Sequence, residues 1–507
     1  MPDEKTVSRR GFIGAALVGS MGIAASSVLA GCSAPASTGG SNDAATASWD
    51  EETDVVVIGA GGAGYAAAIE AANAGSSVLL LEKTNILGGD SALCDGILGA
   101  AESRLAKELG IDVTKDDVYE WFMAHPEWSG PKNTEVARVN ADQGGATIDW
   151  LEELGAPFVQ KVTPRFGYTE LAVIHQIEGK GGEMVRVLSE SADKAGVETM
   201  KETPVSELLT NEEGRVIGVV ATSNKGEMRI KAKKGVVMAT GSYSGSPAVL
   251  GTINPEAVNV QPGSNPGATG DGLAMGISVG AFMSRVTDIP LLSSLVGRDT
   301  GSVVNWNYYE RLHGLWLDAN GERFFDEETP YENPMGHRAI LRKHKEQGKP
   351  VVALVSKTPE LEGILAVRPL KWATADTVEE VAQMVGLDPA KVKATVDRYN
   401  GFCEAGKDED FGRAPEFLIP MTGPFYAATI TQSSSVTMGG FRTNANAQAL
   451  RLKVAAGEGE SLTEPIPGLY AAGVVCEWNC AAGATVLCAM TQGRVAGQNV
   501  AKEEPIA

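Results

Sequence analysis

A glycine-rich turn near residue 60 has the residue types and spacing of a dinucleotide-binding site. Asp54–Ile58 is an apolar run typical of a buried parallel strand, and an alanine-rich segment typical of a helix follows the glycines. Gly59 allows a tight turn, Gly61 lets the backbone approach a pyrophosphate, and Gly64 lets helix and strand pack closely. Glu82, which ends a second apolar strand, is placed to accept ribose hydroxyls. Together these features predict a site for FAD or NAD at the helix N-terminus, which favours anions.

Other segments, in the same order along the chain, resemble the flavin-binding domain of the fumarate reductase and succinate dehydrogenase flavoprotein family. They are Glu82-Lys83 with Gly88-Gly89-Asp90-Ser91, Thr203-Pro204-Val205, Ala239-Thr240-Gly241, Ala268-Thr269-Gly270-Asp271-Gly272, Thr437-Met438-Gly439-Gly440 and Gly468-Leu469-Tyr470-Ala471-Ala472-Gly473. The resemblance spans nearly the whole chain beyond the N-terminal segment. It implies that the cofactor is FAD and that FAD is bound non-covalently.

On this resemblance, segments from both halves of the chain should hold FAD. Gly483–Val486 is expected to begin the last helix, whose N-terminal amides would stabilise negative charge on the pyrimidine end of the reduced flavin. The residues expected to bind FAD are Gly59, Ala60, Gly61, Gly64, Glu82, Lys83, Gly89, Asp90, Ser91, Gly96, Val205, Gly241, Asp271, Gly440, Gly473, Thr485 and Val486.

The resemblance also implies cationic groups for a dicarboxylate substrate, and the chain departs from the family pattern at these positions. Fumarate reductases carry an Arg general acid shortly after an RFxNE-like segment, and a further Arg and a His hold the substrate carboxylates. Tyr331, Cys480 and Val436 stand at the three positions here. Because a buried carboxylate without a partner is costly, fumarate is not the expected substrate.

The active-site segments are closer to those of ketosteroid dehydrogenases. Glu327–Tyr331 matches their Glu-x-x-Pro-Tyr pattern, whose Tyr acts in catalysis, and Ala481–Gly493 follows the spacing of their C-terminal segment. Gly483 falls where that family holds the ketone oxygen with a backbone N–H. Asn479 replaces a neighbouring Tyr of that family.

These segments favour reduction of a C=C bond conjugated to a carbonyl. Hydride would pass from flavin N5 to the β carbon, Tyr331 would protonate the α carbon, and N–H groups near Gly483, aided by Asn479, would hold the enolate oxygen. A phenol has a pKa of about 10, so Tyr331 is protonated at neutral pH and can donate its proton without help from its neighbours, whereas it would need such help to act as a base. This difference favours reduction over dehydrogenation. Ketosteroid-type dehydrogenation, dicarboxylate reduction and ligand binding without turnover stay open, and Tyr331 could instead be a packing residue.

The predicted fold class is α/β, with a Rossmann-like FAD-binding domain of the glutathione-reductase type and an inserted α+β capping domain. Residues 49–282 and 425–507 are expected to form the FAD-binding domain, and residues 283–424 the capping domain. The aromatic residues of the capping segment favour an apolar ring substrate, such as a steroid, a lactone or a phenylpropanoid. They are Trp306, Tyr308, Tyr309, Trp316, Phe324, Phe325, Tyr331 and Trp372.

Within these domains the sequence predicts several local elements. Amphipathic stretches near residues 336–347 and 377–402 indicate two helices. Residues 215–220 and 227–231 indicate a small hairpin inserted in the first part of the FAD-binding domain. Arg323 is expected to pair with a carboxylate and to be structural.

The N-terminus is typical of an export signal. Arg9 and Arg10 precede a weakly apolar stretch rich in glycine and alanine that ends in a lipobox-like Leu29-Ala30-Gly31-Cys32, so residues 1–32 are predicted to be a twin-arginine lipoprotein signal peptide. Cys32 would then carry the lipid that anchors an extracytoplasmic protein to the membrane, and residues 33–48 would be a flexible tether. A transmembrane anchor is the alternative.

The composition limits the partners. A net charge of −21 argues against nucleic acid. The six cysteines form neither CxxC nor a haem-attachment motif, so electrons are expected from a separate membrane cytochrome or a quinone-linked carrier. Cys476, Cys480 and Cys488 have the wrong spacing for the common metal and iron–sulfur patterns, and are predicted to be buried or pocket-lining thiols.

Overall fold

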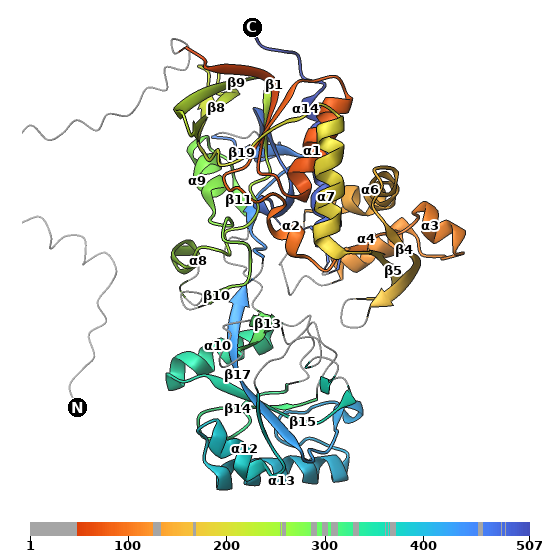
Figure 1. Ribbon diagram of the computed structural model, residues 1–507, viewed down its shortest axis with the longest axis vertical. Helices are drawn as coiled ribbons and strands as arrows, with labels where there is room; N and C mark the ends of the chain where they lie inside the picture. Colours follow the sequence, from red (N-terminus) through yellow and green to blue (C-terminus); the bar gives the residue numbers. More distant parts are fainter. Residues whose placement is uncertain are drawn as a thin grey trace, which may run out of the picture. The chain divides into compact units, whose positions relative to one another are not determined.

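Figure 1 shows a computed structural model of the chain, coloured along the sequence. The structure describes residues 48–124, 133–165, 169–253, 255, 260–284, 292–296, 303–305, 313–327, 334–359, 361–362, 365, 372–434, 436–454, 460–477, 479–481 and 483–507. The predicted signal peptide, all but the last residue of the predicted tether, Trp306, Tyr308, Tyr309 and Tyr331 lie outside these ranges. No helix in the described ranges is both long and apolar enough to cross a membrane.

The first sheet carries the predicted nucleotide fold. Its path among the described residues is β19-β20-β9-β1-β2-β6, and β1 pairs in parallel with both β2 and β9. The β2 side chains and the C-terminal half of β1 are buried, as expected where both faces of a parallel sheet are covered. The strands of the path are β1 (Glu51–Ile58), β2 (Val78–Leu81), β6 (Glu198–Met200), β9 (Gly226–Met238), β19 (Gln448–Leu452) and β20 (Thr463–Ala471).

The predicted hairpin is present, but its second strand is longer than expected. β8 (Val216–Ser223) pairs antiparallel with both β7 (Val205–Thr210) and β9. Residues 227–231, expected to be the second strand of the hairpin, are part of the longer strand β9, which continues to Met238. The hairpin is therefore continuous with the parallel sheet.

Three helices pack against one another beside this sheet. α1 (Gly62–Asn73) lies against α14 (Thr485–Val500) and α7 (Lys180–Lys194) (Figure 1). A Cβ at Gly493 or Gly497 would lie 2.2 Å from a carbonyl oxygen of α1, so these glycines allow the backbones of α1 and α14 to approach closely. The contact holds the N-terminal helix and the C-terminal helix together around one apolar core.

A second sheet is built mainly from residues between 292 and 434. Its path is β13-β12-β17-β15-β14, and β10 and β16 also pair with β17. The strands are β10 (Gln261–Pro262), β12 (Leu292–Val296), β13 (Val303–Asn305), β14 (Leu315–Leu317), β15 (Val351–Ser356), β16 (Ala373–Ala375) and β17 (Phe425–Ser434). β17, predicted to open the second part of the FAD-binding domain, pairs here instead, so the chain returns to the first sheet after Ser434.

The helices of this region differ in one respect from the expectation. α10 (Pro334–Gln347) agrees with the stretch predicted near residues 336–347. The single helix expected at 377–402 is two helices, α12 (Val378–Met384) and α13 (Pro389–Ala405). Gly386 has a φ of +79°, and the Asp388 side chain caps α13 immediately before a proline, so the chain stops and restarts there.

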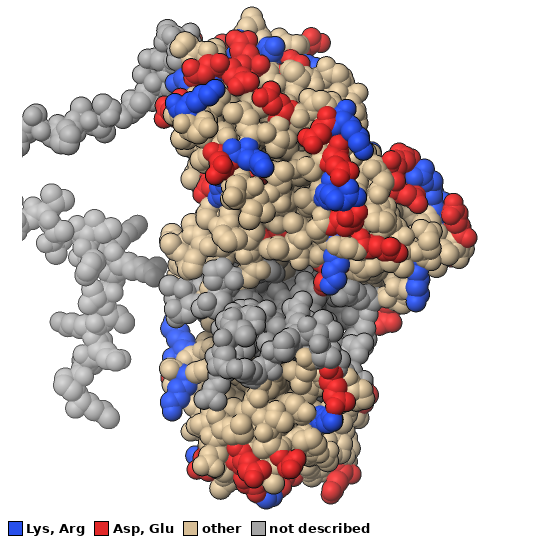
Figure 2. Space-filling model, in the orientation of Figure 1, with Lys and Arg blue, Asp and Glu red and all other residues tan. Residues whose placement is uncertain are grey.

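The remaining elements include a three-stranded sheet of order β3-β5-β4 and a two-stranded sheet of β11 and β18. They are α2 (Gly89–Leu93), β3 (Ile97–Gly99), α3 (Arg104–Glu108), α4 (Lys115–Met123), α6 (Thr134–Glu153), β4 (Phe158–Arg165), β5 (Thr169–Ile177), α8 (Pro247–Ile253), α9 (Asp271–Ser278), β11 (Met283–Ser284), η3 (Pro415–Phe417), β18 (Gly440–Phe441) and η4 (Gly473–Val475). Acidic and basic side chains are interspersed on the face that Figure 2 shows, rather than gathered by sign.

A buried network of charges lies beside the second sheet. Arg323 donates to Glu327 at 2.8 Å and to Asp408 at 2.9 Å, which confirms its predicted pairing with a carboxylate. Arg413 donates to the same Glu327 at 2.6 Å and to the Tyr399 hydroxyl at 2.8 Å. Burial opposes the charge on Arg323, but the two carboxylates outweigh it and raise the pKa of the guanidinium. Two cations and two carboxylates thus balance in the interior.

Candidate functional site

The predicted fingerprint folds as the spacing implies. β1 ends at Ile58, the φ of +101° at the next residue, Gly59, is reached without strain only by glycine, and α1 begins at Gly62. A Cβ at Gly64 would lie 1.8 Å from the Gly59 carbonyl oxygen, so Gly64 provides the predicted close packing of helix and strand. The Ala60 N–H donates to Glu82 Oε2 at 3.1 Å, which ties the turn to the end of β2.

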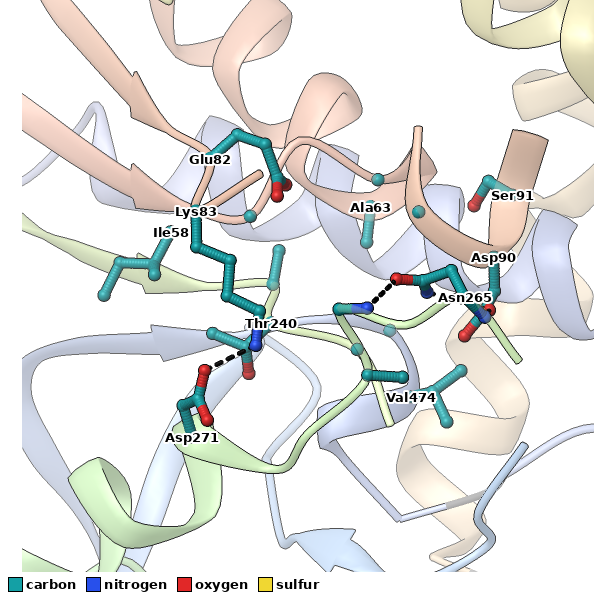
Figure 3. A pocket seen from close by; sticks show the side chains of 18 of the residues that line it. Ile58, Ala63, Glu82, Lys83, Asp90, Ser91, Thr240, Asn265, Asp271 and Val474 are labelled. Carbon is teal, nitrogen blue, oxygen red and sulfur yellow. Dashed lines mark hydrogen bonds and ion pairs between the residues drawn. The ribbon is translucent and has the colours of Figure 1, made fainter. Parts of the chain in front are cut away.

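A cavity of about 940 Å³, a volume that includes space open to solvent, begins at this turn (Figure 3). Its walls come from the end of β1, the loop after β2, the end of β9 and the turn before η4, so segments far apart in the sequence meet around one space. Eleven of the residues predicted to bind FAD line it: Gly59, Gly61, Glu82, Lys83, Gly89, Asp90, Ser91, Val205, Gly241, Asp271 and Gly473.

The cavity fits the pyrophosphate of a dinucleotide at the start of α1. The N-cap of this twelve-residue helix is Gly61, which has no side chain, and the Gly62 N–H donates to the Ser91 hydroxyl at 3.1 Å. The N-terminal end of the helix borders the cavity, where the helix dipole favours an anion. A Cβ at Gly241 would meet no atom within 4 Å, and one at Gly89 would meet only the Asn265 amide at 3.8 Å. Side chains at these two glycines would therefore project into open space that a ligand needs.

Lys83 joins two walls of the cavity. Its Nζ donates to Asp271 Oδ2 at 2.5 Å and also to the Thr269 hydroxyl. Burial opposes ionisation of Asp271, but the hydrogen bonds from Lys83 and Thr269 outweigh it and hold the pKa of this carboxyl below its ordinary value. The ammonium and the carboxylate therefore neutralise each other beside the cavity.

Asp90 has a partner that the sequence reasoning missed. The backbone N–H and the side-chain amide of Asn265 both donate to Asp90 Oδ1, at 2.7 and 2.8 Å. Burial raises the pKa of Asp90, and these hydrogen bonds only partly oppose the shift. The only feature of the sequence that could have indicated Asn265 is its place three residues before the Ala268–Gly272 segment. A residue in an irregular loop has no periodic pattern by which to identify it.

Six predicted cofactor residues do not line the cavity. Ala60 and Gly64 shape the turn behind it, and Val486 packs on the core beside α1. A Cβ at Gly96 would lie 2.7 Å from the Lys180 Cα, and one at Gly440 would lie 2.3 Å from the Val475 carbonyl oxygen. The structure therefore gives these two glycines close backbone contacts. Thr485, the sixth, lies on a neighbouring cavity.

A second, smaller cavity adjoins the first at the N-terminus of α14. The two share Gly473, Val474 and Ala489 in their walls, so they lie side by side. The side chains of the second cavity are mostly neutral: Thr437, Cys476, Asn479, Cys480, Thr485, Cys488 and Gln492, with Glu477 as the charged member. The three cysteines are buried, as predicted, and no group of ligands in the described part of the chain could hold a metal ion.

The predicted catalytic residues differ in what the structure gives them. Gly483, with a φ of +89°, stands at the turn before α14, and its carbonyl oxygen accepts from the Gly99 N–H at 3.0 Å. The Asn479 amide oxygen accepts from the Asn133 N–H at 2.8 Å, and its Nδ2 donates to the Glu477 carbonyl at 3.1 Å. Asn479 lines the second cavity, and its role in holding the enolate oxygen stays a prediction. Tyr331 lies outside the described residues.

Comparison with known proteins gives concordant matches. Residues 54–489 match the model of a family described as FAD binding domain. A probable fumarate reductase of Shewanella frigidimarina is 30% identical over 468 residues, which cover 89% of this chain and 75% of the relative. Digoxin reductase of Eggerthella lenta is 29% identical over an alignment of 579 positions, which covers 99% of this chain and 98% of the relative.

Among solved structures, one match is a 3-ketosteroid-Δ4-(5α)-dehydrogenase from Rhodococcus jostii in complex with 4-androstene-3,17-dione. It superposes with a TM-score of 0.69 at 26% sequence identity, and the match covers 91% of this chain and 99% of the dehydrogenase. The matches thus include both reductases and a dehydrogenase on one fold.

Proposed function

Because the chain belongs to the FAD-binding-domain family and is an FAD-dependent oxidoreductase acting on C=C bonds, we propose that it reduces a C=C bond conjugated to a carbonyl. The substrate class is an apolar compound such as a steroid, a lactone or a phenylpropanoid. Bound FAD would supply the hydride from its N5 position. The residues of this chain would orient the alkene, hold the carbonyl oxygen and deliver the proton.

The observation that carries this proposal is the chemistry of the second cavity. Its described walls offer thiols, hydroxyls and amides, and the carboxylate of Glu477, which pairs with Arg442 at 3.6 Å and with the Ser284 hydroxyl. A dicarboxylate entering this space would lose its hydration and meet no cation from these walls. A neutral enone has no such desolvation cost, and its apolar body suits a wall of buried thiols.

Two relatives support the substrate class without fixing the substrate. Digoxin reductase matches this chain over almost the full length of both proteins. The dehydrogenase structure contains a steroid dione, which indicates that this fold accommodates apolar ring ketones. The same structure favours one second candidate, removal of two hydrogens from a saturated ketone, because a dehydrogenase and a reductase can share one site.

Two groups of this chain would handle oxygen and proton. The N-terminus of α14, which follows Gly483, borders the second cavity, and its free amides would stabilise the charge that develops on the carbonyl oxygen. Tyr331 would protonate the α carbon, an assignment that rests on the Glu-x-x-Pro-Tyr pattern alone. Asn479, which lines the same cavity, would aid in holding the carbonyl oxygen.

The source of electrons and the location of the protein are part of the proposal. The electrons would come from a separate membrane cytochrome or a quinone-linked carrier. The twin-arginine motif and the lipobox-like Cys32 support export followed by lipid anchoring, which would keep the enzyme beside such a carrier.

The test is a proton-donor variant with a matched control. FAD-loaded protein is reduced without oxygen and mixed with an α,β-unsaturated ketone, and flavin reoxidation is followed by absorbance. Tyr331→Phe should slow reoxidation about 10²–10⁴-fold, whereas Tyr426→Phe, in β17, should leave the rate unchanged. Equal rates for Tyr331→Phe and the wild type would remove Tyr331 from the mechanism. Flavin reduction by a saturated ketone instead would establish the dehydrogenase direction.

A further inference from the structure

Thr437 carries a buried hydroxyl that nothing above uses. The residue is 0% exposed, and its Oγ1 has no hydrogen-bond partner within the described part of the chain. Leaving a buried hydroxyl unpaired costs about 1–3 kcal/mol, and most buried polar side chains therefore have a partner. A hydroxyl kept in this state points to a ligand that completes it.

The position of Thr437 indicates which ligand. Thr437 lines the second cavity together with Thr485, the first residue of α14. No side chain caps this sixteen-residue helix, so its first N–H groups and the Thr437 O–H form one set of donors around a common space. On the same wall, Glu477 Oε2 accepts from the Ser284 hydroxyl, and the Asn479 amide oxygen accepts from the Asn133 N–H. A set of donors is complementary to an oxygen that carries or develops negative charge.

We propose that the Thr437 hydroxyl donates a hydrogen bond to a conjugated carbonyl oxygen in the second cavity. Two molecules that meet there carry such an oxygen: the pyrimidine ring of the flavin and the enone substrate. The flavin source follows from FAD binding, whereas the substrate source rests on the proposed function. In either case the bond strengthens as electrons arrive, because reduction places negative charge on the flavin carbonyl and hydride addition places it on the substrate oxygen.

The experiment compares Thr437→Val, which keeps the shape and removes the hydroxyl, with Thr437→Ser, which keeps the hydroxyl. Thr491→Val is the matched control, because Thr491 is equally buried on α14 but donates to Thr147 at 3.0 Å and borders neither cavity. Each FAD-loaded variant is measured for its flavin absorbance spectrum, its two-electron reduction potential without substrate, and its affinity for a non-reducible saturated ketone.

If the flavin is the acceptor, Thr437→Val alters the spectrum and lowers the potential without any substrate present, and this result stands even if no enone is reduced. If the substrate is the acceptor, the flavin properties stay unchanged and the ketone binds about three- to tenfold more weakly. Thr437→Ser should resemble the wild type in both cases. Wild-type values for Thr437→Val in all three measurements, or the same changes in Thr491→Val, would overturn the proposal.

Discussion

Lys83 and Asp271, 188 positions apart in the sequence, form an ion pair of 2.5 Å between two walls of the dinucleotide cavity (Figure 3). Lys83 follows β2, and Asp271 begins α9. The pair therefore joins the first βαβ unit to a segment that lies much later in the sequence. Because both residues line the cavity, we expect the pair to hold its walls around bound FAD.

The first prediction follows from this pair. Lys83→Met should speed FAD release about two- to fivefold, because both partners are partly exposed and such pairs are weak. The increase in flavin fluorescence on dilution measures the rate. High salt should bring the wild type closer to the variant. Arg186→Met, which breaks the exposed pairs on α7, should leave FAD release unchanged; an equal effect there would contradict a local role for Lys83.

A second prediction concerns the packing of α1 on β1. Gly64→Ala should lower the free energy of unfolding by about 1–3 kcal/mol and weaken FAD binding, because the new methyl group would collide with the Gly59 carbonyl. Gly182→Ala, at an exposed position of α7 with no atom within 4 Å of the new Cβ, should instead raise the free energy of unfolding by about 0.5–1 kcal/mol. Urea denaturation measures both. If Gly64→Ala left the free energy of unfolding and FAD binding unchanged, the close contact between Gly64 and the Gly59 carbonyl would be contradicted.

The buried charge network gives a third prediction. Arg413→Met leaves Glu327 short of one partner in the interior, and should lower the free energy of unfolding by about 3–5 kcal/mol. Lys393→Met removes an exposed pair with Asp397 and should change it by less than about 0.5 kcal/mol. The loss in Arg413→Met should be independent of salt, since buried pairs are little screened. A salt-dependent loss would indicate that water reaches the network.

A fourth prediction concerns pH. His175 is fully buried, its Nε2 lies 2.7 Å from the Ser103 hydroxyl, and burial lowers the pKa of the imidazole below its ordinary value. The unfolded chain therefore binds a proton more readily, so stability from this group is full above pH about 6.5 and is lost as the pH falls below it. Urea midpoints measured from pH 7.5 downward should fall less steeply in His175→Asn than in the wild type. If the urea midpoints of His175→Asn and the wild type fell equally steeply with pH, His175 would not be the source of this pH dependence.

The elements around the fingerprint could be predicted because local rules determine them. Gly59, Gly64 and Glu82 occupy the places that their spacing implied, since a strand, a tight turn and a helix in succession leave little freedom. The break between α12 and α13 carries a similar local signal, Gly386 followed by Asp388 and Pro389, which the amphipathic pattern obscured.

Residues whose roles depend on distant segments could not be placed from the sequence. Gly96 and Gly440 resemble cofactor glycines, but each is required by a close backbone contact that only the folded chain reveals. Asn265 and Thr437 lie in loops, where no periodic pattern marks a residue. Asn265 matters because it donates to Asp90, and Thr437 matters because its hydroxyl has no hydrogen-bond partner among the described residues. A motif specifies which segments meet, whereas packing decides which side chains face the ligand.

We propose that this flavoprotein reduces a neutral conjugated carbonyl compound and not a dicarboxylate. The most direct test mixes anaerobically reduced, FAD-loaded protein with an α,β-unsaturated lactone or ketone and, separately, with fumarate at the same concentration. Flavin absorbance then gives both reoxidation rates. The account predicts rapid reoxidation by a neutral enone and none above background by fumarate. Rapid reoxidation by fumarate would contradict it, because the described walls of the second cavity would then hold carboxylates without a cation.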